Sequence, residues 1–296
     1  AALDFIRNEQ FCAEEAALVQ RYISALFYFA TDGENWADAS NWLSSSHECD
    51  WGSINCDTES KTIRVLSNDD NNLGGTIPFE VCFLPSLTII DLDSNQIGGT
   101  IPDSIGDCSN LQTIDVDNNV MSGTIPASLY SIQGLQSLDI DNNQFSGVIS
   151  AEISSLTNLK YLAMQKNIFT GTIPTEIANL GQLEIAYFDG NEFTGTMPAE
   201  VCALVDNSLD KLTSDCSGTP PEVECNCCTG CGASSAAFCD EIGAATELEY
   251  NEKIETILKG ISGDNAFDEN DSDRSAALDF IRNEQFCAEE AAIVQR

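Results

Sequence analysis

The stretch LTIIDLDSNQIGGTIPDSIGDCSN (residues 87–110) is followed directly by four further versions of the same 24-residue pattern. The next version reads LQTIDVDNNVMSGTIPASLYSIQG (111–134), and the last one ends at residue 206. A short, fixed period of this kind predicts a solenoid. One coil cannot bury its own apolar face, so stacked neighbours must supply the core and both ends must be capped.

Each copy predicts a short strand followed by a bend. In the second copy the apolar residues Leu111, Ile114 and Val116 fall on the inner face of a strand. Asp115 and Asp117 alternate with them and fall on the outer face. The asparagine that follows can turn its amide onto the backbone of the neighbouring coil, and glycine and proline mark the bend. The recurring columns are Asn95, Asn119, Asn143, Asn167 and Asn191; Gly99, Gly123, Gly147, Gly171 and Gly195; and Pro102, Pro126, Pro174 and Pro198, with a degenerate earlier copy that carries Asn71, Gly75 and Pro78.

The pattern resembles the plant-type leucine-rich repeat, LxxLxLxxNxLxGxIPxxIxxLxx. The resemblance implies an α/β repeat solenoid, a right-handed horseshoe with a parallel sheet on its concave side and disulfide-stapled caps. We divide the chain accordingly into a helical, Cys/Trp-rich N-terminal cap (1–62) and a solenoid of six coils (63–206). A Cys-rich C-terminal cap (207–231) and a helical joint (232–296) follow.

The N-terminal cap combines three tryptophans with a cysteine pair. Trp36, Trp42 and Trp51, together with Cys49 and Cys56, resemble the cap of plant-type repeats. The resemblance implies a Cys49–Cys56 disulfide. A tryptophan cluster can bind a sugar, but beside a capping disulfide we expect it to be core.

The other cysteines also indicate an oxidising compartment. Cys82 and Cys108 sit on adjacent coils, close enough to form a disulfide. Six more, between Cys202 and Cys231, form the C-terminal cap, and their pairing stays open. Disulfides are favoured over a metal cluster because no histidine lies nearby. This cap and the segment QRYISALFYFATDGENW resemble extracellular leucine-rich-repeat proteins of diatoms and related algae, so we expect a secreted or cell-surface protein.

A second, much longer repeat joins the two ends of the chain. Residues 276–296 repeat residues 1–21 with one change, Leu18 to Ile293. This predicts that the whole module is the 275-residue unit of a tandem array. Counted per unit, the cysteines leave Cys239 and Cys12, whose copy in the next unit is Cys287. We therefore predict a Cys239–Cys287 disulfide across the joint, with a Cys12–Cys239 bridge as the alternative.

The charge of the chain restricts its partners. A net charge of −36 argues against nucleic acid and anionic membranes and favours cations or basic polymers. No apolar run is long enough to span a bilayer in this stretch. The only histidine, His47, has no evident nucleophile beside it, so we do not expect an enzyme.

Two columns of aspartate lie on the outer face of the expected sheet. Neighbours in a column would stand about 5 Å apart, where like charges repel by about 1 kcal/mol in water and several times more at a dielectric of about 20. Hard cations such as calcium prefer paired carboxylates, so a calcium site is one interpretation and a solvated acidic face is the other. The candidate ligands are Asp91, Asp115 and Asp139 in the first column and Asp93, Asp117 and Asp141 in the second.

Two further features carry candidate functions. Asn270 lies in the sequon Asn270-Asp271-Ser272 of an acidic loop and is a candidate glycosylation site. A column of threonines could bind ice or carry O-glycans, although GTIP is ordinary sequence for such repeats: Thr76, Thr100, Thr124, Thr172 and Thr196.

Together these observations favour a structural subunit of an extracellular filament or cell-surface fibre, built from modules joined head to tail. The alternative is an extracellular binding module, a receptor ectodomain or adhesin, that recognises glycan, peptide or mineral on the concave face.

Overall fold

The computed structural model describes residues 15–205, 207–218 and 221–232. The chain divides into two compact units, residues 1–231 and 232–296, and the account below concerns the first. Within the described ranges no helix has the length and apolar character needed to cross a membrane. The predicted helix over residues 1–30 is described from Glu15 onward, as α2 (Glu15–Ala30).

The N-terminal cap packs α2 against a tryptophan cluster and a short hairpin. Its turns are η1 (Gly33–Asn35) and η2 (Glu48–Asp50), and β1 (Ile54–Cys56) pairs antiparallel with β2 (Ile63–Ser67). Phe27 of α2 contacts both Trp36 and Trp42, with ring centroids 5.8 and 6.1 Å apart. All three tryptophans of the cap are buried, so they belong to the core.

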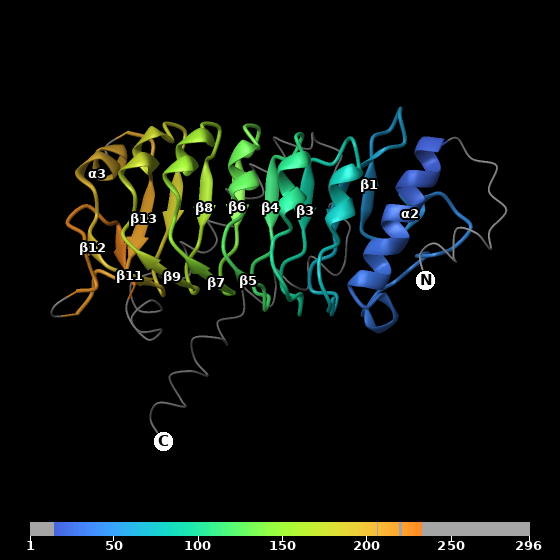
Figure 1. The fold of residues 1–296 in the computed structure, drawn as a ribbon, viewed down its shortest axis with the longest axis horizontal. Helices are drawn as coiled ribbons and strands as arrows, with labels where there is room; N and C mark the ends of the chain where they lie inside the picture. The colour runs from blue at the N-terminus through green and yellow to red at the C-terminus, as the bar shows by residue number, and fades with distance from the viewer. Residues whose placement is uncertain (1–14, 206, 219–220, 233–296) are drawn as a thin grey trace, which may run out of the picture. The chain divides into compact units, whose positions relative to one another are not determined.

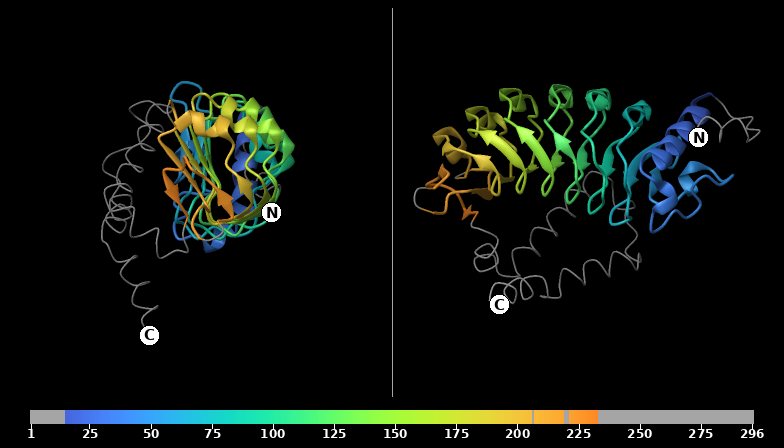
Figure 2. Two further views of the ribbon diagram at one scale, coloured as in Figure 1. Left: turned by 90° about the vertical axis from the view of Figure 1, so that its left-hand side faces the viewer. Right: turned by 60° about the horizontal axis from the view of Figure 1, so that its bottom comes forward.

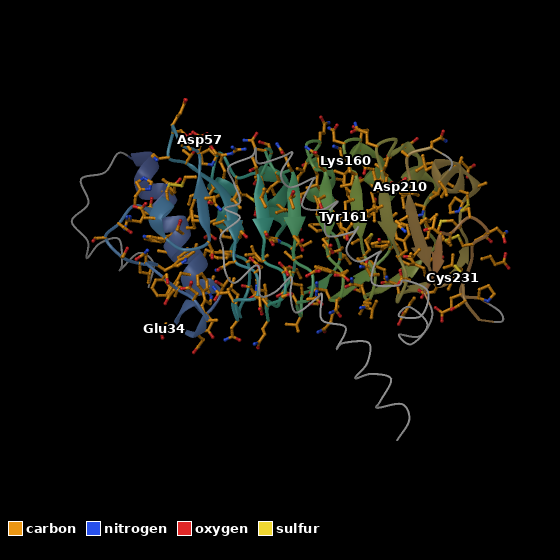
Figure 3. The ribbon with its side chains drawn as sticks, turned by 180° about the vertical axis from the view of Figure 1, so that it is seen from behind. Glu34, Asp57, Lys160, Tyr161, Asp210 and Cys231 are labelled. Carbon is orange, nitrogen blue, oxygen red and sulfur yellow. A yellow bond between two sulfur atoms is a disulfide. The ribbon has the colours of Figure 1, made fainter. Side chains whose placement is uncertain are left out.

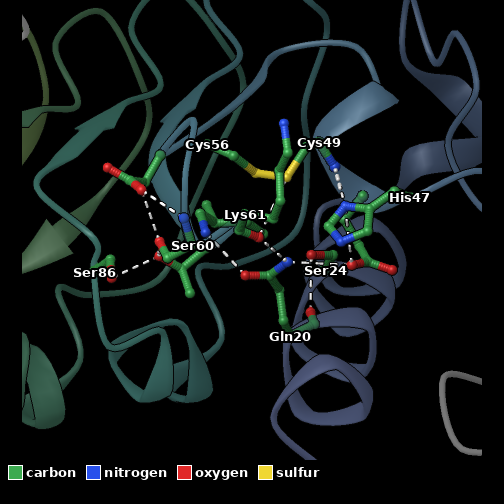
Figure 4. The surroundings of a disulfide bond; sticks show 12 residues. Gln20, Ser24, His47, Cys49, Cys56, Ser60, Lys61 and Ser86 are labelled. Atoms are coloured by element: carbon green, nitrogen blue, oxygen red, sulfur yellow. Dashed lines mark hydrogen bonds and ion pairs between the residues drawn. A yellow bond between two sulfur atoms is a disulfide. The ribbon is translucent and has the colours of Figure 1, made fainter. Parts of the chain in front are cut away.

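Polar side chains of α2 hold the helix to this cap (Figure 4). The Gln20 amide donates to Glu48 Oε2 and to the Lys61 carbonyl, each at 3.2 Å, and its oxygen accepts from the Ile63 N–H at 2.9 Å. Arg21 forms an ion pair of 2.5 Å with the same Glu48. The Cys49–Cys56 disulfide closes the loop beside them.

The main sheet runs the length of the solenoid (Figure 1). Within the described residues it has nine strands in the order β1-β2-β3-β4-β6-β8-β10-β13-β15, parallel from β2 onward. Its register advances by one repeat from strand to strand, so that Ile90 pairs with Ile114 and Ile114 with Leu138. The strands after β2 are β3 (Ile89–Asp91), β4 (Thr113–Asp115), β6 (Ser137–Asp139), β8 (Tyr161–Ala163), β10 (Ile185–Tyr187), β13 (Lys211–Ser214) and β15 (Gly230–Cys231).

A second, smaller parallel sheet occupies the segment that the sequence indicates only as a bend. Its order is β11-β9-β7-β5. A separate strand pair, β12 with β14, lies at the C-terminal end. The strands are β5 (Ser122–Gly123), β7 (Gln144–Gly147), β9 (Ile168–Gly171), β11 (Glu192–Phe193), β12 (Gly195–Thr196) and β14 (Val223–Glu224).

Single 3-10 turns complete each coil, and the last coil has a short α-helix instead (Figure 2). In four of the five turns the residue before the turn is a proline, such as Pro102 at φ −68°, which is preset for a turn start. The turns are η3 (Phe79–Phe83), η4 (Asp103–Asp107), η5 (Ala127–Ser131), η6 (Ala151–Ser155) and η7 (Thr175–Asn179), and the helix is α3 (Ala199–Val205).

The core lies between the main sheet, the second sheet and the turns. Its members repeat as columns, and the rings of Phe145, Phe169 and Phe193 stack with centroids 6.5 and 6.1 Å apart. The predicted asparagine column is confirmed as a ladder of hydrogen bonds between coils. Asn119 Oδ1 accepts from the Ile97 N–H at 2.8 Å, and its amide donates to the Leu92 carbonyl at 2.9 Å.

Disulfides close both ends of the solenoid. Cys82–Cys108 joins the first two turns. The pairing left open from the sequence is Cys202–Cys227, Cys216–Cys231 and Cys225–Cys228. At this end Asp215 takes the place of the asparagine of a further coil, because its carboxylate accepts from the N–H groups of Gly190 and Asn191 at 2.8 and 3.1 Å.

Candidate functional site

The outer face of the main sheet carries a continuous ladder of carboxylates, which we call the acidic ladder. In the first column Asp91 pairs in register with Asp115, and Asp115 pairs with Asp139. The second column comes two residues later in each coil, and alternate residues of an extended segment point to the same side. Its members are Asp69, Asp93, Asp117 and Asp141, followed after Gln165 by Asp189.

The structure brings five of the six candidate calcium ligands into two groups of three. In the first group oxygens of Asp69, Asp91 and Asp93 all lie within 4.8 Å of one another. The second group consists of Asp115, Asp117 and Asp139 and meets the same limit. Asp69 belongs to the degenerate first copy of the repeat and is not among the ligands predicted from the sequence.

Asp141, the sixth candidate, lies in the ladder but outside both groups. Its carboxylate accepts a hydrogen bond of 2.8 Å from the Gln165 amide, and it shares a second one with Asp117. Lys166 lies near enough to favour its ionised form. Asp141 therefore has one neutral and one basic neighbour that partly compensate its charge.

Burial and mutual repulsion raise the pKa of every carboxyl in the second column from Asp93 to Asp141. Desolvation, followed by the charges of Asp117 and Asp69, raises the pKa of Asp93 to about 7. Desolvation and the charge of Asp141 raise the pKa of Asp117 to about 8. The pKa of Asp141 is raised to about 7, mainly by desolvation and by Asp139.

The first column shows the same trend. Desolvation is the main cause that raises the pKa of Asp91 and of Asp115 well above its ordinary value. The next cause is the charge of Asp93 for the former and of Asp139 for the latter. A ladder whose carboxyls resist ionisation near neutral pH takes up protons or other cations readily, because either removes the repulsion.

The local backbone fixes these carboxylates in place. Asp115 Oδ1 accepts from the N–H of Asp117 at 3.3 Å, and Asp139 Oδ1 accepts from the N–H of Asp141 at 3.2 Å. Between residues that the structure describes, Arg21 and Glu48 form an ion pair in the N-terminal cap. The ladder ends where Ala163 and Tyr187 replace aspartate in the first column. Figure 3 labels three residues in this part of the sheet: Lys160, just before β8, Tyr161, the first residue of β8, and Asp210, just before β13.

The second sheet presents an uncharged outer face in the middle coils, which we call the hydroxyl face. The predicted threonine column lies on it and is exposed, and Val148, which interrupts it, is 62% exposed. A parallel column two residues earlier was not anticipated from the sequence. The nine positions of three successive coils carry no charge: Val120, Ser122 and Thr124; Gln144, Ser146 and Val148; Ile168, Thr170 and Thr172.

Glycines hold the threonine methyl groups in position on this face. A Cβ on Gly123 would lie 2.7 Å from Thr100 Cγ2, and one on Gly147 would lie 2.9 Å from Thr124 Cγ2. Both glycines have positive φ, 86° and 88°. The glycine of one coil thus provides the space into which the threonine of the preceding coil packs.

Other predicted sites fall outside the described residues. These are the glycosylation candidate Asn270 and the Cys239–Cys287 disulfide, together with its alternative partner Cys12. His47 lies in the N-terminal cap, where its Nδ1 accepts from the Cys49 N–H at 3.2 Å.

Comparison with known proteins agrees with this architecture. Family models of the leucine-rich repeat match residues 85–145 and 158–180. The solenoid is built of leucine-rich repeats. No curated protein sequence matches the chain. The five disulfides among the described residues, together with leucine-rich-repeat ectodomains as structural neighbours, indicate an extracellular protein.

Three solved structures illustrate the likeness. A plant ice-binding protein has a TM-score of 0.59 and 28% identity, over 73% of this chain and 66% of that one. The PEPR1–AtPEP1 complex has a TM-score of 0.50 and 29% identity, over 64% of this chain and 30% of that one. The ectodomain of the Arabidopsis thaliana receptor kinase GASSHO1/SCHENGEN3, in complex with CASPARIAN STRIP INTEGRITY FACTOR 2, has a TM-score of 0.50 and 28% identity, over 55% and 23%. This chain thus spans less than a third of the length of the last two of these chains.

Proposed function

We propose that the chain is an extracellular binding module that recognises a basic, extended segment of a peptide or protein along the acidic ladder. The observation that carries this proposal is the ladder itself, with its carboxyl pKa values raised to about 7 and 8. Successive carboxylates recur at the strand spacing of about 4.8 Å. Lysine or arginine side chains of a bound segment would replace the protons that the ladder otherwise retains. The PEPR1–AtPEP1 complex and the GASSHO1/SCHENGEN3 ectodomain with its bound factor support a module of this class.

Binding of an oligolysine peptide tests the proposal, measured calorimetrically at two salt concentrations. The triple variant Asp93→Asn/Asp117→Asn/Asp141→Asn should weaken binding by about tenfold or more, equivalent to 1.4 kcal/mol or more. The matched control, Asp103→Asn/Asp107→Asn/Glu200→Gln, removes the same number of carboxyl groups from exposed positions on the turn η4 and on α3. Equal losses in the two variants would show that the peptide senses only net charge, and the proposal would fail.

The near-identity of residues 1–21 and 276–296 supports an arrangement of such modules in a tandem array. Within such an array the solenoid would act as a structural subunit of an extracellular filament, joined head to tail through residues 232–296. Electron microscopy of the native protein distinguishes the two roles. Regular fibres would support the filament, whereas separate solenoids on a flexible chain would argue against it.

The hydroxyl face supports a second binding function, adsorption to ice. It is uncharged over three coils in a chain with a net charge of −36, so solubility does not account for it. Its hydroxyl and methyl groups recur about every 4.8 Å along the solenoid and about every 6.7 Å along each strand, and the glycines fix their orientation. The likeness to a plant ice-binding protein supports the same function.

Inhibition of ice recrystallisation tests this second function. The variant Thr124→Lys/Thr172→Lys places two charges on the hydroxyl face and should abolish the activity. The control Ser109→Lys/Thr175→Lys places two charges at exposed positions on the turns and should retain it. Absence of activity in the unmodified protein, or equal loss in both variants, would refute ice binding.

A further inference from the structure

Two disulfides of the C-terminal cap lie directly beside each other. Cys225 is bonded to Cys228, and Cys202 is bonded to Cys227. The sulfur of Cys225 lies 3.9 Å from the sulfur of Cys227. Thiol–disulfide exchange begins with the attack of a thiolate on a disulfide sulfur. If the Cys225–Cys228 bond were broken, a thiolate at Cys225 would therefore stand next to a second disulfide that it can attack.

Backbone hydrogen bonds hold both ends of the short segment that carries these sulfurs. Cys225 directly follows β14, whose last carbonyl accepts from the N–H of Met197 at 2.8 Å. Cys228 directly precedes Thr229, whose N–H donates to a carbonyl of the main sheet at 2.8 Å. Neither anchor depends on the Cys225–Cys228 bond. The two thiols should therefore stay near their present positions when that bond is reduced.

The Cys225–Cys228 bond is also the one that an external thiol should break first. Its sequence separation is 3, the shortest of the five disulfides in the described residues, whereas that of Cys202–Cys227 is 25. In the chain-entropy model a short loop gains least from its disulfide. Both of its cysteines are only half-buried, and exposed disulfides are the more easily reduced ones. The Cys82–Cys108 bond, by contrast, is buried.

We propose that Cys225 and Cys228 form a thiol-responsive site that opens the Cys202–Cys227 disulfide by internal exchange, with a dithiol as the external reductant. One dithiol reduces the Cys225–Cys228 bond to two thiols and is itself oxidised to a disulfide. Cys225 loses its proton to water and attacks Cys227 Sγ. A Cys225–Cys227 bond forms, the bond to Cys202 breaks, and Cys202 leaves as a thiolate that takes up a proton. This exchange needs no further redox partner, and a second dithiol then reduces the Cys225–Cys227 bond.

The exchange would release the last coil from the end of the cap. Cys202 lies on α3, and Cys227 lies in the segment that ends the described chain. The Cys216–Cys231 disulfide would still join the parts of the cap on either side of that segment. Neither the acidic ladder nor the hydroxyl face contributes a residue to this site, so its failure would leave both proposed binding functions standing.

Reduction of the whole chain by dithiothreitol, quenched with an alkylating reagent at successive times, tests the proposal. Trypsin cleaves after Lys211 and so separates Cys202 from the other cysteines of the cap, and mass spectrometry then identifies each alkylated cysteine. In the unmodified protein Cys228 should be alkylated before Cys202. Alkylation of Cys202 first would overturn the proposal.

Two single variants form a matched pair, because each removes the same disulfide and leaves one thiol. In Cys228→Ser the thiol that remains is the one beside Cys227, whereas in Cys225→Ser it is the other. Dithiothreitol should release Cys202 about tenfold or more faster in Cys228→Ser than in Cys225→Ser, because an attacking group held in place acts at a high effective concentration. A mere loosening of the cap would speed both variants alike, so equal rates would also overturn the proposal.

Two checks precede the comparison of rates. Thermal unfolding without reductant verifies that both variants are folded, and if either is not, the order of alkylation in the unmodified protein decides. Disulfide mapping before reduction establishes the starting pairing. A Cys225–Cys227 bond already present in Cys228→Ser, with Cys202 free, would support the exchange directly.

Discussion

Replacement of Asn119 by alanine tests what holds neighbouring coils together. The side chain is 7% exposed. Its Oδ1 is the acceptor for the Ile97 N–H at 2.8 Å. Its amide donates to the carbonyls of Leu92, Val116 and Asp117 at 2.9, 3.2 and 2.8 Å. Alanine removes all four hydrogen bonds and cannot replace any of them.

The expected loss of stability depends on which hydrogen bonds each partner of Asn119 keeps in the alanine variant. The three carbonyls keep another donor: the Asn95 amide for Leu92, the Asn143 amide for Val116, and the Ser94 N–H for Asp117. The Ile97 N–H keeps none that the structure shows, and a buried orphaned donor costs about 1–3 kcal/mol. Loss of the shared bonds to the carbonyls adds about 1–2 kcal/mol. Asn119→Ala should therefore lower the free energy of unfolding by about 2–5 kcal/mol.

Urea unfolding followed by circular dichroism and by tryptophan fluorescence measures this loss, provided that the two probes report one transition. Asn110→Ala is the matched control, because Asn110 is exposed and makes a single bond of 2.8 Å to the Pro85 carbonyl. We expect the control to change stability by about 0.5 kcal/mol or less. If the two variants lose the same amount, the asparagine ladder does not hold the coils, and the reasoning is wrong.

Three further predictions concern stability. In chelator, the melting temperature should fall as the pH is raised from 5.5 to 9. In the folded protein the carboxyls of Asp93, Asp117 and Asp141 have pKa values of about 7 to 8, above the ordinary value of about 4, so the stability that they contribute is present at low pH and is lost as the pH rises through the folded pKa values. A melting temperature that rises over this range would contradict the prediction. The double variant Cys82→Ser/Cys108→Ser opens a loop with a sequence separation of 26. It should lower the free energy of unfolding, measured in urea, by about 3.5 kcal/mol. A loss below about 1 kcal/mol would refute the chain-entropy estimate. Gly123→Ala should lower the free energy of unfolding by about 2–4 kcal/mol, because Gly123 has a positive φ and the new Cβ would meet the Thr100 methyl group. Gly181→Ala is the control and should be neutral or slightly stabilising, because nothing lies within 4 Å of its new Cβ. Similar values for the two variants would argue against the packing described.

The repeat period was enough to predict the coils because stacking turns each sequence position into a column. Asn119 and Asn143 occupy equivalent places in consecutive coils, and each makes the same bonds to the coil before it. The inward leucines and the outward aspartates follow from the same translation. A period read from the chain therefore predicts the register of the sheet as well as its existence.

The second sheet was not predicted because its strands are two to four residues long and three of the four end in glycine. Glycine is depleted in strands and typical of turns. At Gly123 and Gly147 a positive φ bends the chain directly after a few paired residues. These residues form strands because they pair with the neighbouring coil, and the propensity of a local sequence carries no information about that coil.

The C-terminal disulfides could not be derived because six cysteines allow 15 connectivities. The observed pairs join α3 and the main sheet to a segment without a repeat pattern, as in Cys202–Cys227 and Cys216–Cys231. The members of the carboxylate groups were also not fully predictable. Asp69 belongs to a degenerate copy, and Asp141, which lies outside both groups, accepts a hydrogen bond from Gln165 of the next coil.

The two candidate surfaces show how a repeat of this kind acquires function. A residue fixed at one position of the period becomes a column, so an acidic position yields a ladder of repulsive charge and a threonine position yields a regular neutral face. In the acidic ladder, carboxylates repel one another, and a bound cation or basic segment relieves that repulsion. The hydroxyl face is uncharged, so binding there depends on the fixed positions of its hydroxyl and methyl groups. The columns also break independently: Ala163 ends the first, and Gln165 interrupts the second before Asp189. Val148 interrupts the threonine column, which resumes at Thr172 and runs to Thr196. Because the surfaces lie on different sheets and vary independently along the chain, substitutions in the acidic ladder should leave the hydroxyl face unchanged.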